Sequence, residues 1–450
     1  MRRVVCSSTI AMLLALGAPA AELKVPPPFR PILDLVNSSP PEFAAQAMLR
    51  MVASGKIDDK ETRRQLCLRA FEAAASAHER IMRRAIPGVT GDSVAGALDA
   101  SYRLRLDMLS LQSKAVLLLL HDDKRKAREI FEQIPRPSIP QLTCGDALIY
   151  DVSDYVAALQ AVEEQSFTEA ERKKEDHVAF LLTYLSGITS PSELAPAARL
   201  AAGAGGLTNN ERDLLVNRFN GVLEAMNPDY RAFAAIAGDL RSAITPAMRL
   251  SFDKLADKVK NSTHCGDPSS SAFKPVRLAS GVTPPQMPDT QPFWQSAGAK
   301  DMLTRAKKVR FGDDRKPYTN ADRETPEWRD QYAEFVGSLD SWNPDPDEPP
   351  AVFFHERVII YQGLMDIAPT AAARRRLLED FMGFLNASPL QRDNPPEWFS
   401  TIAAMWHRIP FHEAGEPEAC ADALSRSGNP VVSLYLMLEK IIPEPFGGFH

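Results

Sequence analysis

After its first twenty residues, the chain lacks an apolar stretch long enough to cross a membrane. A membrane-spanning helix needs about 20 consecutive apolar residues, and the densest later candidate covers only residues 115–120. We therefore expect no integral membrane segment once a signal is removed. The chain also lacks an excess of positive charge, since its formal net charge is −6. Because nonspecific nucleic-acid binding depends on basic patches that displace counterions, we expect no nucleic-acid partner.

The common catalytic and cofactor motifs are missing as well. The sequence has no Gly-x-Ser-x-Gly elbow, no phosphate-binding glycine loop and no dinucleotide fingerprint. The glycine-rich stretch 202–206 follows a helical pattern instead of a strand, so it predicts a helix end and turn. The sequence thus predicts no cofactor and no bound metal, and it favours a protein that is not an enzyme.

Cysteine is scarce, with five in 450 residues, and Cys6 lies within the first twenty. The other four are Cys67, Cys144, Cys265 and Cys420, and an even number in an exported chain favours disulfides. We predict the pairs Cys67–Cys144 and Cys265–Cys420, because this pairing keeps each bridge on one side of a proline-rich stretch. Buried free thiols are the alternative, above all for Cys67, which lies on an apolar helical stripe. No pair has the spacing of a zinc knuckle.

The strongest positive signal is residues 1–20. Arg2 and Arg3 precede a short apolar stretch, and positions 18–20 (Ala-Pro-Ala) supply the small residues that a signal peptidase recognises. This pattern is typical of a secretory signal peptide. It predicts cleavage close to Ala20 and an exported protein, periplasmic or extracellular.

Helical periodicity dominates the remaining sequence. Apolar residues recur three and four positions apart, most clearly over 45–52, 215–226, 248–259 and 378–385. Thr168 begins a capping-box pattern, which marks the start of a helix. No series of alternating strands is evident. The sequence therefore predicts an all-α fold of irregular stacked helical hairpins, an α-solenoid-like array.

A proline-rich stretch divides the chain. Residues 264–292 contain six prolines and a run of serines, which predicts a linker or surface crossing. All five tryptophans follow it: Trp294, Trp328, Trp342, Trp398 and Trp406. We therefore predict a signal peptide (1–20), an N-terminal helical array (21–263), this linker, and a smaller, Trp-containing helical C-terminal region (293–450).

Three polar clusters suggest metal chemistry, but each has a simpler interpretation. His355-Glu356 would need a second histidine one turn later to bind zinc, and that position is Ile359, so we interpret the pair as a helix surface. Residues 407–413 hold two histidines and a glutamate, but aromatic neighbours favour a packed turn. The acidic stretch 343–348 lacks the glycine and glutamate spacing of an EF-hand.

Other polar patterns also have structural interpretations. His121 and the two aspartates after it end one helix and start the next, and 175–177 is interpreted as a solvated charged face. The basic run 305–316 is offset by two aspartates and predicts a solvated helix end. The triplet Pro-Glu-Trp occurs at 326–328 and 396–398, and it predicts two helix starts with a tryptophan anchor.

Two hypotheses for function remain. The first is an exported helical scaffold that binds a protein or peptide partner, because helical arrays present extended concave faces. The alternative is a periplasmic or secreted enzyme acting on polysaccharide or peptidoglycan, because a glycosidase needs only two carboxylates in a cleft, at no fixed sequence spacing. A deep cleft with two facing carboxylates would favour the enzyme, and a broad apolar or aromatic groove would favour the scaffold.

Overall fold

A computed structural model describes most of the chain. It covers residues 23–91, 93–142, 146–226, 230–261, 297–312, 314–343, 350–408 and 428–442, together with 422 and 426. Several sequence predictions lie outside the described residues: the signal 1–20, the linker 264–292, Cys144, Cys265, Cys420, the acidic positions 345–348, and the His-Glu pair at 412–413.

The described residues are predominantly helical, which confirms the all-α prediction of stacked helices. The N-terminal array contains α1 (Arg30–Val36), α2 (Pro41–Ala53), α3 (Lys60–Ala74), α4 (Val94–Tyr102), α5 (Met108–Leu119), α6 (Lys124–Phe131), α7 (Ser153–Ser166), α8 (Glu169–Lys173), α9 (Asp176–Ser186), α10 (Leu194–Gly203), α11 (Asn209–Ala225), α12 (Tyr230–Ala243) and α13 (Arg249–Lys260). The C-terminal region contains α14 (Ala297–Arg310), α15 (Asn320–Arg323), α16 (Pro326–Ser338), α17 (Pro350–Met365), α18 (Ala371–Ala387), α19 (Leu390–Asp393), α20 (Pro395–Arg408) and α22 (Pro430–Ile441). None of the described helices is long and apolar enough to span a membrane.

Local signals determine where several helices begin and end. The Thr168 hydroxyl accepts the N–H of Glu171, whose carboxylate in turn accepts the Thr168 N–H at 2.7 Å, so the predicted capping box is confirmed. Asp123 caps α6 by accepting the N–H of Lys126 at 2.9 Å. After α10 the chain turns through Gly206 with φ +71°, a conformation that favours glycine, as the prediction of a helix end and turn requires.

A two-stranded sheet is the element that the sequence did not indicate. Strand β1 (Arg83–Ala85) pairs antiparallel with β2 (Leu148–Tyr150), with Arg83 opposite Tyr150. Strands of this length are too short for an alternating apolar pattern to be recognised. The pair joins the segment before α4 to the segment before α7, and so links two parts of the array.

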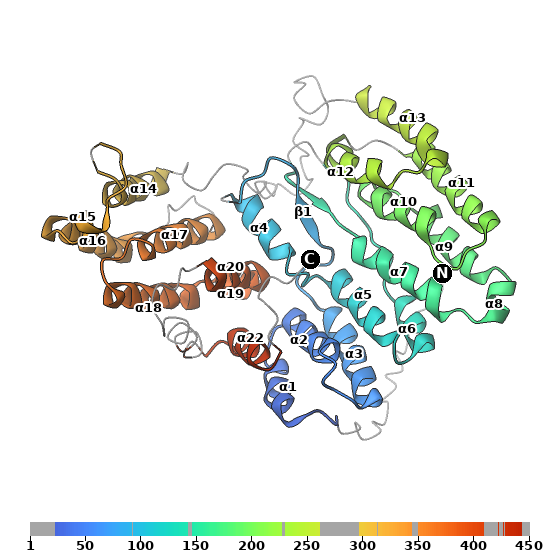
Figure 1. The fold of residues 1–450 in the computed structure, drawn as a ribbon, viewed down its shortest axis with the longest axis horizontal. Coiled ribbons are helices and arrows are strands. Elements are labelled where there is room, and N and C mark those ends of the chain that lie inside the picture. The colour runs from blue at the N-terminus through green and yellow to red at the C-terminus, as the bar shows by residue number, and fades with distance from the viewer. Residues whose placement is uncertain are drawn as a thin grey trace, which may run out of the picture.

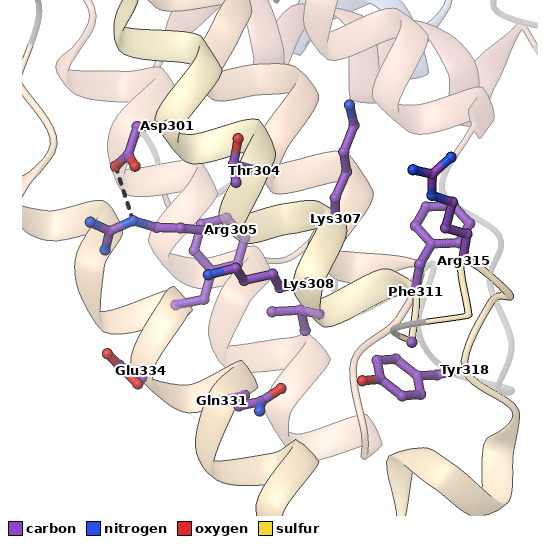
Figure 2. A pocket seen from close by; sticks show the side chains of 13 residues that line it. Asp301, Thr304, Arg305, Lys307, Lys308, Phe311, Arg315, Tyr318, Gln331 and Glu334 are labelled. Carbon is purple, nitrogen blue, oxygen red and sulfur yellow. Dashed lines mark hydrogen bonds and ion pairs between the residues drawn. The ribbon is translucent and has the colours of Figure 1, made fainter.

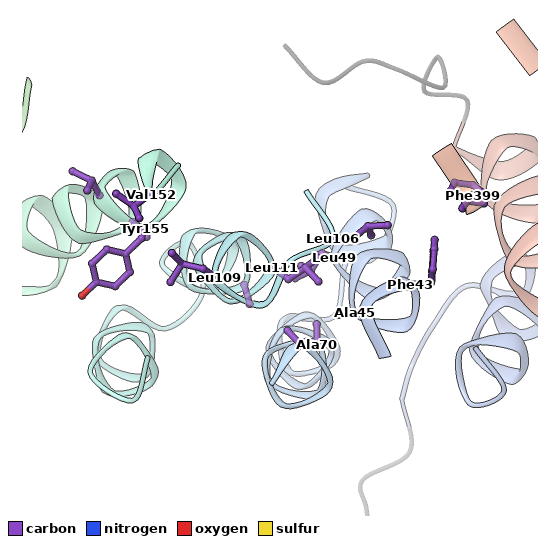
Figure 3. Packing of buried hydrophobic residues seen from close by; sticks show 14 of the residues in the cluster. Phe43, Ala45, Leu49, Ala70, Leu106, Leu109, Leu111, Val152, Tyr155 and Phe399 are labelled. Atoms are coloured by element: carbon purple, nitrogen blue, oxygen red, sulfur yellow. The ribbon is translucent and has the colours of Figure 1, made fainter. Parts of the chain in front are cut away.

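One continuous core runs through the array and into the C-terminal region. The Phe43 ring of α2 packs edge-on against Phe399 of α20, with centroids 5.3 Å apart, and against Tyr435 of α22 at 6.0 Å. Figure 3 shows the buried side chains continuing from Phe399 past α2, α3 and α5 to Tyr155 of α7. The C-terminal helices therefore share their apolar burial with the first helices of the chain.

Polar contacts reinforce this junction between the two ends of the chain. Figure 1 shows α20 beside α4, and α22 beside α1 and α2. The buried Arg50 of α2 forms an ion pair with Glu439 of α22 at 3.0 Å, and its guanidinium lies over the Tyr435 ring. Lys56 Nζ donates to the Ile441 carbonyl at 2.6 Å. Helix α22 is thus fixed by both apolar and charged contacts.

Candidate functional site

An open cleft lies in the C-terminal region between α14, α16 and the hairpin of residues 311–318 (Figure 2). Its volume is about 1090 Å³. Four cations line it: Arg305, Lys307, Lys308 and Arg315. Two carboxylates, Asp301 and Glu334, also line it, together with three aromatic residues: Phe311, Tyr318 and Phe335. The cleft is therefore basic, on a chain whose formal net charge is −6.

Within the described residues, most of these cations make no ion pair. Arg305 Nε lies 3.0 Å from an Asp301 carboxylate oxygen, one turn earlier on the same exposed helix. In the part of the chain that the structure describes, Lys307, Lys308 and Arg315 have no carboxylate within ion-pair distance. Their charge is therefore available to a ligand.

The hairpin that carries Arg315 is tightly hydrogen-bonded. The Gly312 N–H donates to the Lys316 carbonyl at 3.0 Å, and the Arg315 N–H donates to the Gly312 carbonyl at 2.9 Å. Asp314 accepts the Lys316 N–H at 3.0 Å. Arg315 itself has φ +62°, in the left-handed region where side chains other than glycine are strained. The structure thus holds this arginine at the cleft in an unfavourable backbone conformation.

A buried tryptophan sets how α16 lies against α14. The Trp328 Nε1–H donates to the Val309 carbonyl at 2.8 Å, which places the first turn of α16 at the last turn of α14. The matching Trp398 of α20 donates to the Leu385 carbonyl at 2.9 Å. Both tryptophans are buried in the first turn of a helix that begins with proline. The prediction that each Pro-Glu-Trp triplet starts a helix anchored by tryptophan is confirmed.

The prediction that His355-Glu356 lies on a helix surface is wrong. Both side chains are buried, and His355 Nε2 lies 2.8 Å from an oxygen of Glu397 on α20. The second Glu397 oxygen accepts the side-chain N–H of Asn394 at 2.8 Å. Helix α17 has apolar residues on nearly all sides, so neighbouring helices cover it and leave little solvent face. The His–Glu contact joins α17 to α20 inside the core.

A second buried acid–histidine cluster lies where α7, α8, α9 and α11 meet. Glu163 is fully buried, and burial raises the pKa of its carboxyl to about 7, while Arg172 at 3.1 Å opposes that rise. Burial also lowers the pKa of His177, whose Nε2 lies 3.4 Å from a Glu211 oxygen. The predicted solvated face is therefore wrong for His177, although its two acidic neighbours in sequence are exposed. The cluster ties helices together.

The cluster that begins at His121 has the structural role that the sequence suggested. Its last member, Asp123, is the N-cap of α6. Asp122 accepts two hydrogen bonds from the Arg63 guanidinium of α3, at 2.9 and 2.5 Å. In the described residues, no group of three or more histidine, cysteine or acidic side chains is placed to hold a metal ion.

Cys67 is a buried free thiol on α3, and burial raises its pKa to about 12. The structure therefore does not support a disulfide at Cys67 and agrees with the alternative of a buried thiol there. Its predicted partner Cys144, like both members of the pair Cys265–Cys420, lies outside the described residues. A high thiol pKa also argues against reactivity at Cys67, because the thiolate is the nucleophile.

Comparison with known proteins adds no assignment to this geometry. No known family model, curated protein or solved structure matches the chain.

The basic run 305–316 is evident in the sequence, but the cleft is not. The sequence predicts a solvated helix end, and Lys307 and Lys308 do lie exposed in the last turn of α14, where cations interact favourably with the helix dipole. That interpretation does not cover Arg315, which lies beyond the helix. The available signal was the turn Gly312-Asp-Asp, because a tight turn after a basic helix brings later cations back beside earlier ones.

Proposed function

We propose that this chain is an exported helical binding protein whose partner is another protein. The observation that carries the proposal is the basic cleft, where three cations without ion-pair partners in the described structure face an open space. Such charges add little to folding stability but strongly influence the rate and specificity of association. The continuous core of the stacked helices supplies a rigid scaffold for that surface.

Export is proposed from residues 1–20 alone, where two arginines, a short apolar stretch and Ala-Pro-Ala precede the first described helix. N-terminal sequencing of the protein isolated from its native host tests this part of the proposal. We expect a mature start close to Ala20. Soluble mature protein that retains Met1 would contradict export.

The alternative function is a polysaccharide- or peptidoglycan-acting enzyme, and one observation favours it, since the cleft contains two carboxylates. Asp301 and Glu334 are both exposed, however, and Asp301 is already paired with Arg305. The general acid of a glycosidase is typically a carboxyl kept protonated by an apolar, buried environment. Binding therefore accounts for the cleft better than bond cleavage does.

Site-specific photocrosslinking in the native host tests the binding function. A photoreactive phenylalanine analogue replaces Gln331, which is exposed in the cleft, and in a matched variant it replaces Arg125, which is exposed on α6. We expect a discrete protein adduct from position 331 and a weaker or absent one from position 125. If neither position gives a protein adduct and the purified chain releases soluble fragments from peptidoglycan, the binding function is wrong.

A further inference from the structure

A small cavity lies where α20 of the C-terminal region packs against α4 of the array (Figure 1). Its volume is about 10 Å³, close to the smallest space that holds one water molecule, roughly 10–15 Å³. The lining comes from the loop after α3, from the stretch between α4 and α5, and from the start of α20. Its polar members are Glu79, Ser101, Tyr102, Asp107 and Asn394.

Asp107 contributes a buried oxygen that has no partner. The side chain is 3% exposed, and its Oδ1 caps α5 by accepting the Ser110 N–H at 3.0 Å. Its Oδ2 is also buried and accepts no hydrogen bond in the part of the chain that the structure describes. Buried polar atoms are nearly always bonded to protein or to ordered water. An unsatisfied oxygen beside a polar cavity of this size therefore indicates a bound water.

The opposite wall of the cavity offers further partners for a water. The side-chain oxygen of Asn394 accepts the Glu397 N–H at 3.3 Å, and its nitrogen donates to the Glu397 carboxylate at 2.8 Å. Both atoms of the amide can form a second hydrogen bond. The Ser101 hydroxyl donates to the Leu98 carbonyl at 2.8 Å and can still accept. With Asp107, these groups give the two to four partners that a buried water needs.

In the described residues, no cation forms an ion pair with Asp107. The two arginines nearest in sequence are paired elsewhere, Arg105 with Asp154 at 2.6 Å and Arg83 with Glu79 at 3.4 Å. The ionisable groups around the cavity, taken from every element that lines it, are Glu79, Arg83, Tyr102, Arg105, Asp154 and, beyond Asn394, Glu397. A charge on Asp107 is therefore buried without compensation.

Burial raises the pKa of the Asp107 carboxyl to about 6, the hydrogen bonds from Ser110 oppose this rise, and the nearby Asp154 adds to it. The ordinary value is 3.8. Because the pKa is raised in the folded state, the stability that this carboxyl contributes is present below the ordinary value and is lost as pH rises through about 6. Asp107 is thus neutral in mild acid and charged at neutral pH.

We infer that the cavity holds one ordered water that bridges Asp107 and Asn394, and that loss of the Asp107 proton loosens the contact between α20 and the array. The water joins the caps of two helices, α5 and α20, from opposite sides of the seam. Glu397, which binds Asn394, also contacts His355 of α17, and α17 packs on α14 beside the basic cleft. The proton therefore acts at the connection between the array and the helices that carry the cleft. This inference does not depend on the proposed function.

Hydrogen exchange of the full wild-type chain tests the inference without any substitution. Rates measured at about pH 5 and about pH 8 are corrected for the pH dependence of intrinsic exchange. We expect amides in the first turn of α20 to open about tenfold more often at the higher pH, because at pH 5 the proton on a carboxyl of pKa about 6 favours the closed seam by that factor.

Matched substitutions assign the effect to Asp107. Asp107→Asn keeps the cap of α5, because asparagine caps a helix as well as aspartate does, but it cannot ionise. The pH response of α20 should disappear in this variant. The control Asp123→Asn makes the same change at the cap of α6, and it should keep the tenfold response. Glu163→Gln, which removes the buried carboxyl of α7, should keep it too.

A high-resolution crystal structure of the wild-type chain in mild acid tests the water itself. We expect one ordered water within hydrogen-bond distance of both Asp107 Oδ2 and the Asn394 side chain. Three results would overturn the inference: a cavity without water density, an exchange rate of α20 that does not change with pH after correction, or equal loss of the response in Asp107→Asn and Asp123→Asn.

Discussion

Arginines of the N-terminal array and cations of the C-terminal cleft are used in opposite ways. In the array, two arginine side chains join separate helices: Arg128 of α6 pairs with Glu171 of α8 at 2.7 Å, and Arg172 of α8 pairs with the buried Glu163 of α7 at 3.1 Å. In the cleft, the ion pair of Arg305 is local to one helix, and Arg315 makes none in the described structure. This contrast separates charge that holds the fold from charge that a ligand can use.

Burial explains the contrast. An arginine between helices loses water on folding, so it is retained only where a carboxylate compensates for the loss. An exposed cation needs no such partner, and its contribution to stability is small. The comparison therefore predicts that substitutions in the array change stability, whereas substitutions in the cleft change binding.

The largest expected effect is in the array. Arg172→Ala should lower the free energy of unfolding by about 3–5 kcal/mol, because it leaves Glu163 buried without its cation. Urea unfolding measures this. The matched control Arg305→Ala, which breaks an exposed pair at a similar distance, should cost less than about 1 kcal/mol. Equal losses of unfolding free energy in the two variants would show that the buried and the exposed ion pair contribute alike, which contradicts the contrast between array and cleft.

The next effect is a pH dependence from Glu163. Its folded-state pKa of about 7 lies above the ordinary value of 4.5, so the stability that this carboxyl contributes is present below that value and is lost as pH rises toward 7. The advantage of Glu163→Gln over wild type should therefore grow by about 2 kcal/mol between about pH 5 and about pH 8. His177 contributes a slope of opposite sign, but it does so in both proteins.

Urea unfolding of wild type and Glu163→Gln at both pH values measures the effect. A difference between the two proteins that does not change with pH would show that Glu163 is not buried as described.

A smaller effect sharpens the comparison at the cleft. Arg315→Gly should raise the free energy of unfolding by about 0.5–1 kcal/mol, because glycine adopts φ near +62° without strain. The control Lys316→Gly, one residue later and without a positive φ, should give no gain. Thermal or urea unfolding distinguishes them. Arg315→Gly should also weaken binding of the protein partner, so that stability and binding change in opposite directions.

Local features of the fold were predictable from sequence because their causes are local. The capping box at Thr168 and the cap at Asp123 require only neighbouring residues, and they occur as predicted. The four clearest periodic stretches form α2, α11, α13 and α18. The tryptophan anchors at 328 and 398 followed from the same first-turn pattern.

Features that depend on distant segments were not predictable. His355 has a charged neighbour in sequence and was placed on a surface, yet its partner Glu397 comes from another helix. The docking of α22 on α1 and α2 joins the two ends of the chain, and no local pattern encodes it. The positive φ of Arg315 was not predictable for a different reason, because residue type alone predicts glycine, and not arginine, at such a position.

The central claim is that the cations of the cleft do not hold the fold together. Urea unfolding of the double variant Lys307→Ala/Arg315→Ala tests it most directly, because alanine removes both charges and keeps the strained backbone of residue 315. The account predicts a free energy of unfolding within about 0.5 kcal/mol of wild type. A loss greater than about 2 kcal/mol would show that these side chains make structural contacts, and it would contradict their assignment to a ligand.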